Sequence, residues 1–196
     1  MGTTTLIVII VVIVIAVSLL VLFFASRRRA AQRSEEQRER SREEFGSEYE
    51  RVAQERGSEE EAERELRERR GRVERRVEPL SEESRGRYEE QWGEVERVFV
   101  DNPERSIEMA DRTVSDILDE RNFVSKAGQS EEETEQGLAA MHPDIADDYR
   151  EARRIRADVV ARSAGRGEEG SNEESTEVLR QAIRKYRAVY ERLVRE

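Results

Sequence analysis

The segment from Leu6 to Phe24 is an apolar run of 19 residues in which Ser18 is the one polar side chain. As an α-helix, Thr5 to Ala25 would be about 31 Å long, which matches the hydrocarbon thickness of a bilayer. No water-soluble fold requires such a segment, so the sequence predicts a transmembrane anchor over residues 1–25. The candidate anchor residues are Leu6, Ile10, Val14, Ser18, Phe23 and Phe24.

Three consecutive arginines at positions 27–29 follow the apolar run directly. Short flanks rich in Arg stay in the cytoplasm, so we expect a single pass through the plasma membrane with the C-terminal domain cytoplasmic and the N-terminus outside. A cleaved signal peptide is the competing interpretation, but its cations would precede a shorter apolar stretch, and Met1–Thr5 contains no Lys or Arg. Arg27, Arg28, Arg29 and Arg33 are the candidate topology and lipid-headgroup residues. A positive-inside signal explains them more simply than specific binding of anionic headgroups, which stays open.

Charged side chains make up 41% of the chain and hydrophobic ones 36%, with the apolar run included. The chain outside the apolar run can therefore bury only a small hydrophobic core, and amphipathic helices fit that composition best. Residues 26–78 hold 16 basic and 16 acidic side chains, whereas residues 79–196 hold 19 and 29, so the net charge of −10 belongs to the distal part. An acidic domain repels phosphate backbones, so nucleic acid is not an expected partner. The absence of cysteine excludes disulfides and thiolate chemistry.

Residues 26–78 are dense in Glu and Arg, often four apart on one helix face, as in Glu60 and Arg64. The apolar stripe is sparse and is interrupted at Gly57, where we expect one helix to end and Ser58 to cap the next. The pattern predicts a charged helical stalk next to the membrane, which Pro79 terminates. Whether two copies pair as a coiled coil stays open, because Arg and Glu often occupy the seam positions.

Beyond Pro79, apolar residues recur at intervals of three and four, the spacing of one buried helix face. Ser81 is expected to cap the first helix, and Asp101 or Asn102 the second, with Pro103 in its first turn. These two helices should form an antiparallel hairpin. The predicted bundle core contains Tyr88, Trp92, Phe99, Ile107, Val114, Tyr149, Leu179, Tyr186 and Tyr190.

The last third of the chain should supply the other helices of this bundle. Residues 122–136 have the composition of a polar connection, which leads into a short helix that ends near Met141. A longer helix follows Pro143, and residues 165–174 have no apolar side chain and are expected to be a loop. The final helix should be capped by Ser175. We therefore expect an all-α protein with a bundle of about four helices over residues 79–196.

The sequence offers little catalytic chemistry. His142 is the one histidine, and it precedes a proline at a helix boundary, so a turn or capping role is favoured over a metal site. The many carboxylates lie in runs on exposed helix faces, where acid–base catalysis lacks the burial it needs. No glycine-rich phosphate loop or nucleophile elbow is present. We therefore expect no enzyme activity, no cofactor and no metal.

Three stretches resemble a family of uncharacterised small membrane or putative secreted proteins frequent in actinobacteria. They are RYEEQWGEVERVFVDNPERSIEMADRTVSDIL, HPDIADDYREARRI and LRQAIRKYRAVYERLV, which begin at Arg87, His142 and Leu179. The family pattern has Arg-Gly-Tyr where this chain has Arg121, Asn122 and Phe123, which leaves the loop conformation there open. The resemblance implies a shared architecture and no activity, and a secreted location would conflict with the topology expected above.

The function expected from these observations is that of a non-catalytic scaffold or protein-interaction module at the membrane, with its binding face on the acidic bundle. Two alternatives stay open. A cleaved or inverted apolar segment would give an extracytoplasmic envelope protein. A stalk like the b subunit of ATP synthase shares the anchor and the charged helix, but Pro79, Pro103 and Pro143 interrupt the continuous rod that such a role needs. The identity of the partner and the oligomeric state are not encoded in these patterns.

Overall fold

The computed structural model describes residues 2, 35–123, 130–165 and 172–195. It separates the chain into two units, Met1–Glu44 and Phe45–Glu196. Among the described residues, none of the helices combines the length and the apolar character that a membrane crossing requires. The predicted anchor run, Leu6–Phe24, and the four candidate topology arginines lie outside the described residues.

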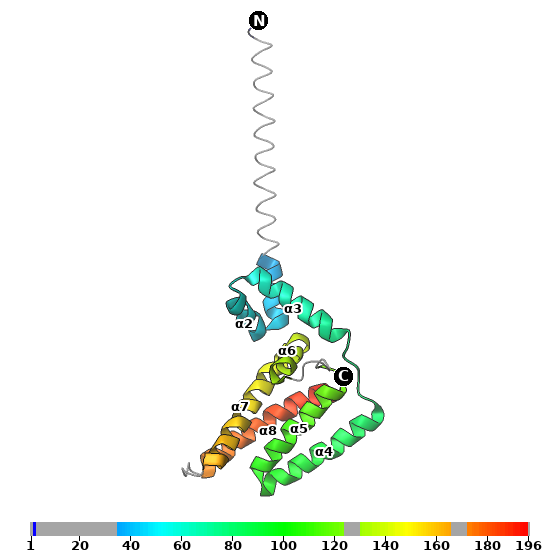
Figure 1. The fold of residues 1–196 in the computed structure, drawn as a ribbon, viewed down its shortest axis with the longest axis vertical. Helices are drawn as coiled ribbons and strands as arrows, with labels where there is room; N and C mark the ends of the chain where they lie inside the picture. Colours follow the sequence, from blue (N-terminus) through cyan, green and yellow to red (C-terminus); the bar gives the residue numbers. More distant parts are fainter. Residues whose placement is uncertain (1, 3–34, 124–129, 166–171, 196) are drawn as a thin grey trace. The chain divides into compact units, whose positions relative to one another are not determined.

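The regular structure of the described residues is helical throughout, which confirms the all-α class. Figure 1 shows these helices, and α2 to α8 belong to the second unit. Their bounds are α2 Ser47–Arg56, α3 Glu59–Glu74, α4 Glu82–Asp101, α5 Pro103–Glu120, α6 Glu131–Met141, α7 Pro143–Gly165 and α8 Asn172–Arg195.

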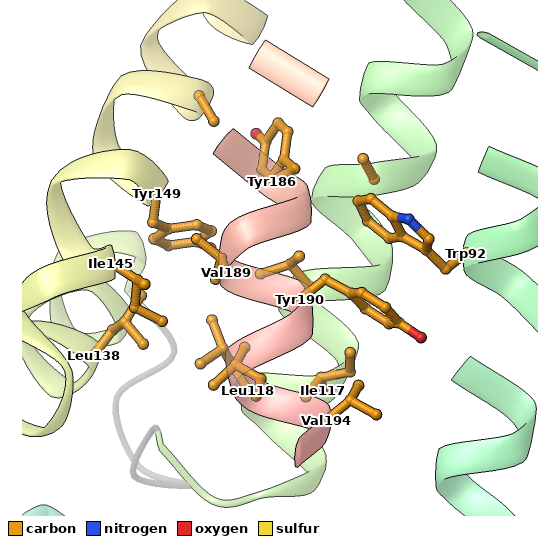
Figure 2. Packing of buried hydrophobic residues seen from close by; sticks show 14 of the residues in the cluster. Trp92, Ile117, Leu118, Leu138, Ile145, Tyr149, Tyr186, Val189, Tyr190 and Val194 are labelled. Atoms are coloured by element: carbon orange, nitrogen blue, oxygen red, sulfur yellow. The ribbon is translucent and has the colours of Figure 1, made fainter. Parts of the chain in front are cut away.

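Helix α5 is central to a bundle, because it packs against α4, α7 and α8, while α7 also packs against α8 (Figure 1). One continuous apolar core joins these helices. Figure 2 shows the ring of Trp92 on α4 facing that of Tyr190 on α8, stacked with 4.4 Å between their centroids. The rings of Tyr149 on α7 and Tyr186 on α8 meet edge to face at 6.5 Å. Aromatic pairs of both kinds add to the stability that burial alone gives.

Short polar side chains start several helices at the predicted places. The Ser81 hydroxyl accepts a hydrogen bond from the Ser84 amide at 3.0 Å, and Asn102 Oδ1 accepts one from the Arg105 amide at 3.1 Å. Ser58 caps α3 in the same way, through the Glu61 amide. These caps satisfy amides that the first helical turn leaves without partners, so the three predictions are confirmed.

Two helix starts were predicted too late. Helix α6 begins at Glu131, inside the predicted polar connection, because Ser130 caps it and accepts a hydrogen bond from the Glu133 amide. Helix α8 begins at Asn172, before the predicted cap Ser175. In both cases the first turn is rich in Glu, and acidic side chains favour a helix N-terminus electrostatically.

The region predicted as a stalk contains a folded pair of helices. Gly57 adopts a left-handed conformation with φ of 68°, which ends α2 and lets α3 pack back against it. A small second core holds Phe45, Tyr49, Val52, Ala62 and Leu66. Helix α3 also packs against α6. The two compact units of the chain meet between Glu44 and Phe45.

The end of α5 forms a compact corner around Asn122, which has a positive φ of 58°. The Phe123 amide donates to the Leu118 carbonyl at 2.9 Å and the Asn122 amide to the Asp119 carbonyl at 3.0 Å. This is a Schellman motif, in which Asn replaces the usual glycine. The Arg121 side chain, which is buried, donates to the Glu78 carbonyl at 3.2 Å and to the Leu193 carbonyl at 2.8 Å. The corner thus ties α5 to the α3–α4 linker and to α8.

Candidate functional site

A polar cavity of about 410 Å³ lies between α5, the start of α6 and α7. Asp111, Arg112 and Ser115 line it from α5, and Tyr149, Arg153 and Arg156 line it from α7. Ser130 and Thr134 contribute from the first turns of α6. Because charged groups and hydroxyls dominate this lining, the cavity suits a small polar ligand and not an apolar one.

Asp111 is the buried charge at the base of this cavity. Its Oδ1 accepts a hydrogen bond of 2.9 Å from the Tyr186 hydroxyl. Arg153 Nε lies 3.4 Å from Oδ1, and Arg156 Nη1 lies 3.3 Å from Oδ2. A buried carboxylate needs such partners, since desolvation without them would cost several kcal/mol. Two guanidinium groups therefore face one carboxylate here.

The two tyrosines beside Asp111 remain protonated. Burial, together with the negative charge and hydrogen bond of Asp111, raises the pKa of Tyr186 far above its ordinary value. Burial also raises the pKa of Tyr149 to about 12, although the nearby Arg153 lowers it in part. At neutral pH both phenols are hydrogen-bond donors, and neither is poised to act as a general base.

Sequence reasoning missed the residues around this cavity, although one signal was present. The inner face of α5 carries Ile107, Val114 and Leu118, and Asp111 lies at the helical spacing of that buried face. A charge inside an apolar stripe indicates a buried partner, because a buried carboxylate is otherwise too costly. The identities of Arg153, Arg156 and Tyr186 as those partners could be found only from the fold.

A second buried carboxylate, Glu48, lies near the start of α2 and is 1% exposed. Arg51 donates to it through two nitrogens, at 2.5 and 3.1 Å, and Arg69 Nη1 on α3 donates at 3.0 Å. Arg150 Nη2 on α7 lies 3.7 Å from Glu48 Oε2. This cluster joins three helices, and arginines contact both carboxylate oxygens of Glu48, so we interpret it as structural.

His142 occupies the boundary between α6 and α7, where the sequence placed it. Its amide donates to the Leu138 carbonyl at 2.7 Å, and its ring centroid lies 5.8 Å from that of Phe123. Over the ranges that the structure describes, no group of three or more His, Asp or Glu side chains is arranged to hold a metal ion.

The structure brings most of the candidate core residues together in the bundle. Phe99 is partly buried and packs against the core, and the others are buried: Tyr88, Trp92, Ile107, Val114, Tyr149, Leu179, Tyr186 and Tyr190. These aromatic rings are therefore part of the bundle interior and do not form an exposed recognition surface. The candidate anchor residues and Arg27, Arg28, Arg29 and Arg33 fall outside the residues that the structure describes.

Comparisons with protein families, curated proteins and solved structures found no significant match to this chain.

Proposed function

We propose that the chain is a single-pass membrane protein whose helical domain lies on the cytoplasmic side and acts as a non-catalytic interaction module. The observation that carries the proposal is the apolar run Leu6–Phe24 with the arginines at 27–29 directly behind it. That combination is typical of a retained anchor with a cytoplasmic C-terminal side. The resemblance to uncharacterised small membrane proteins of actinobacteria belongs to the same proposal.

Three features of the described helices support a binding role over catalysis. The aromatic side chains of the bundle are used in its core. Asp111 is held by two arginines and a tyrosine, so this buried carboxylate is not available as a base. Residues 79–196 carry 29 acidic and 19 basic side chains, so the bundle has an excess of negative charge. Such a surface can offer complementary charge to a basic partner protein.

The folded pair α2 and α3 favours a compact module over a rod-like stalk. A stalk of the ATP synthase kind transmits force along one continuous helix, whereas this chain reverses at Gly57 and buries Tyr49 and Leu66 in the small second core. The envelope-protein alternative depends on topology and on cleavage, both of which experiment can decide.

The anchor can be tested by membrane fractionation combined with the intact mass of the protein. We expect the full-length chain to stay in carbonate-washed membranes. The variant Ile10→Arg/Val14→Arg places two arginines inside the apolar run. It should release the protein from the membrane, because each arginine costs roughly 3 kcal/mol in the hydrocarbon core of a bilayer. The matched control Ala31→Arg/Gln32→Arg adds the same charge outside the run and should remain bound. A soluble wild-type protein, or a mass that lacks the first segment, would refute the proposal.

A further inference from the structure

The cavity between α5, α6 and α7 is lined by three arginines and three carboxylates. The arginines are Arg112, Arg153 and Arg156, and Asp111 is the one buried carboxylate. Arg112 and the other two acidic lining residues, Glu108 and Asp119, are exposed to solvent on α5. Arg153 and Arg156 compensate the buried charge of Asp111, so the arginine donors that remain unpaired determine what the cavity can bind.

The guanidinium group of Arg112 has hydrogen-bond donors that no described residue uses. The structure gives it no hydrogen bond and no ion pair with another described residue, and its neighbour Asp116 acts on it only through space. A guanidinium group has five N–H donors in a planar fork that fits an oxyanion. Arg112 is thus free, within the described part of the chain, to bind a ligand that enters the cavity.

Arg156 also has donors to spare. It contacts Asp111 through Nη1 at 3.3 Å, while its Nε has no acceptor among the described residues. On the same wall, burial keeps Tyr149 protonated, and the Ser115 hydroxyl also lines the cavity. The cavity therefore combines two incompletely satisfied guanidinium groups with neutral hydroxyls.

We propose that this cavity binds a small oxyanion, a phosphate or carboxylate group carried on a polar molecule, held by Arg112 and Arg156. Charge-assisted hydrogen bonds from arginine are strong and directional, and Arg pairs phosphate and carboxylate oxygens in a bidentate way. The volume of about 410 Å³ falls within the range of small-molecule sites and exceeds what one inorganic ion needs. The group can belong to a soluble metabolite or to a phospholipid headgroup.

The test is calorimetric titration of inorganic phosphate into the full chain held in phosphatidylcholine nanodiscs, with chloride at equal ionic strength as the reference. We expect saturable binding of phosphate, weakened about tenfold or more in Arg112→Gln, the order of one lost charge-assisted hydrogen bond. Arg112→Lys keeps the charge without the fork and should bind with intermediate affinity. The control Arg154→Gln removes an exposed arginine of α7 that does not line the cavity and should bind as wild type does.

Two results would overturn the proposal: no saturable binding to the wild-type chain, or equal weakening by Arg112→Gln and Arg154→Gln. Because Arg112 has no described partner, its substitution should leave the thermal midpoint unchanged, which separates lost binding from lost folding. A second titration in nanodiscs that contain phosphatidic acid distinguishes the sources. If phosphatidic acid weakens phosphate binding to the wild-type chain but not to Arg112→Gln, the site binds the lipid headgroup. If phosphatidic acid has no effect on phosphate binding, the site binds a soluble anion.

Discussion

Gly137 on α6 lies against the backbone of Phe123, just beyond the end of α5. A Cβ atom there would sit 2.8 Å from the Phe123 carbonyl oxygen, which accepts a hydrogen bond from Arg76 Nη2, while Arg76 Nε donates to the neighbouring Asn122 carbonyl. We therefore expect Gly137→Ala to lower the free energy of unfolding by about 1–3 kcal/mol, because a backbone atom must move. Urea unfolding followed by the fluorescence of the single tryptophan, Trp92, measures this change.

The control for this prediction is Gly86→Ala in α4, where an added Cβ meets nothing within 4 Å. Alanine is the better helix former, so this change should raise the free energy of unfolding by roughly 0.5–1 kcal/mol. Substitution by alanine should thus change the free energy of unfolding in opposite directions at these two helical glycines. A gain at both positions would contradict the close approach of α6 to Phe123.

The hydroxyl of Tyr186 should make stability sensitive to alkaline pH. In the unfolded chain a tyrosine loses its proton near pH 10, whereas burial and Asp111 raise the pKa of Tyr186 in the folded state. Above pH 10 the unfolded state binds fewer protons, so the free energy of unfolding falls as pH rises. Tyr149 acts in the same direction, with a pKa raised to about 12 by burial.

Tyr186→Phe should therefore flatten the decline in stability between pH 10 and 12. At neutral pH the same variant should lose about 1–3 kcal/mol, because Asp111 loses its 2.9 Å donor. Circular dichroism during urea unfolding at several pH values measures both effects. Tyr190→Phe is the comparison at neutral pH, since no hydrogen bond to its hydroxyl is seen among the described residues, and it should cost at most about 0.5 kcal/mol. An unchanged pH slope in Tyr186→Phe would show that Tyr186 does not titrate as described.

At the scale of elements, the helix pair α2 and α3 is joined to the bundle through Glu48. Glu48→Gln keeps the shape of the side chain but removes the charge, which leaves the buried Arg69 with Glu65 alone. We expect a loss of about 2–4 kcal/mol, since a buried guanidinium loses part of its compensation. Hydrogen exchange should become faster in α2 (Ser47–Arg56) and stay unchanged in α5.

Glu55→Gln gives a matched control for Glu48→Gln on the same helix. Glu55 pairs with the same Arg51, at 2.6 Å, but its side chain is 52% exposed. An exposed pair contributes little, so a change below about 0.5 kcal/mol is expected. Equal protection of α2 in wild type and Glu48→Gln would indicate that the apolar contacts of Tyr49 and Val52 hold the pair without the charge cluster.

The elements themselves were largely predictable because their signals are local. Ser81 and the pair Asn102-Pro103 mark helix starts within a few residues of sequence, and the periodic aromatic residues mark the faces that pack. The return of α3 onto α2 was not predictable, because a sparse apolar stripe fits a lone rod and a folded pair equally well. Gly57 indicated a break, but it carries no information about which surface the next helix covers.

The candidate site was not predictable for a different reason. Asp111 and Glu48 have the same side chains as the many exposed carboxylates around them, and only the fold distinguishes them. The partners of Glu48 include Arg150 and those of Asp111 include Tyr186, which lie far away in the sequence. Their pairing follows from how α7 and α8 cross the other helices, which no local pattern encodes.

At the scale of the whole molecule, the central claim is that the helical domain is held on the cytoplasmic side of a membrane. The absence of cysteine makes this claim directly measurable, because a single introduced thiol is the one reactive site in the chain. Val100 is a suitable position on the domain, since its side chain is 81% exposed at the end of α4. Thr3 is the matching position before the apolar run.

The decisive measurement is labelling of Val100→Cys and Thr3→Cys in intact cells with a maleimide that cannot cross membranes. The positive-inside rule predicts that the cysteine at position 3 is labelled in intact cells, whereas the one at position 100 is labelled only after lysis. Labelling at position 100 in intact cells would place the bundle outside the cytoplasm and contradict the account.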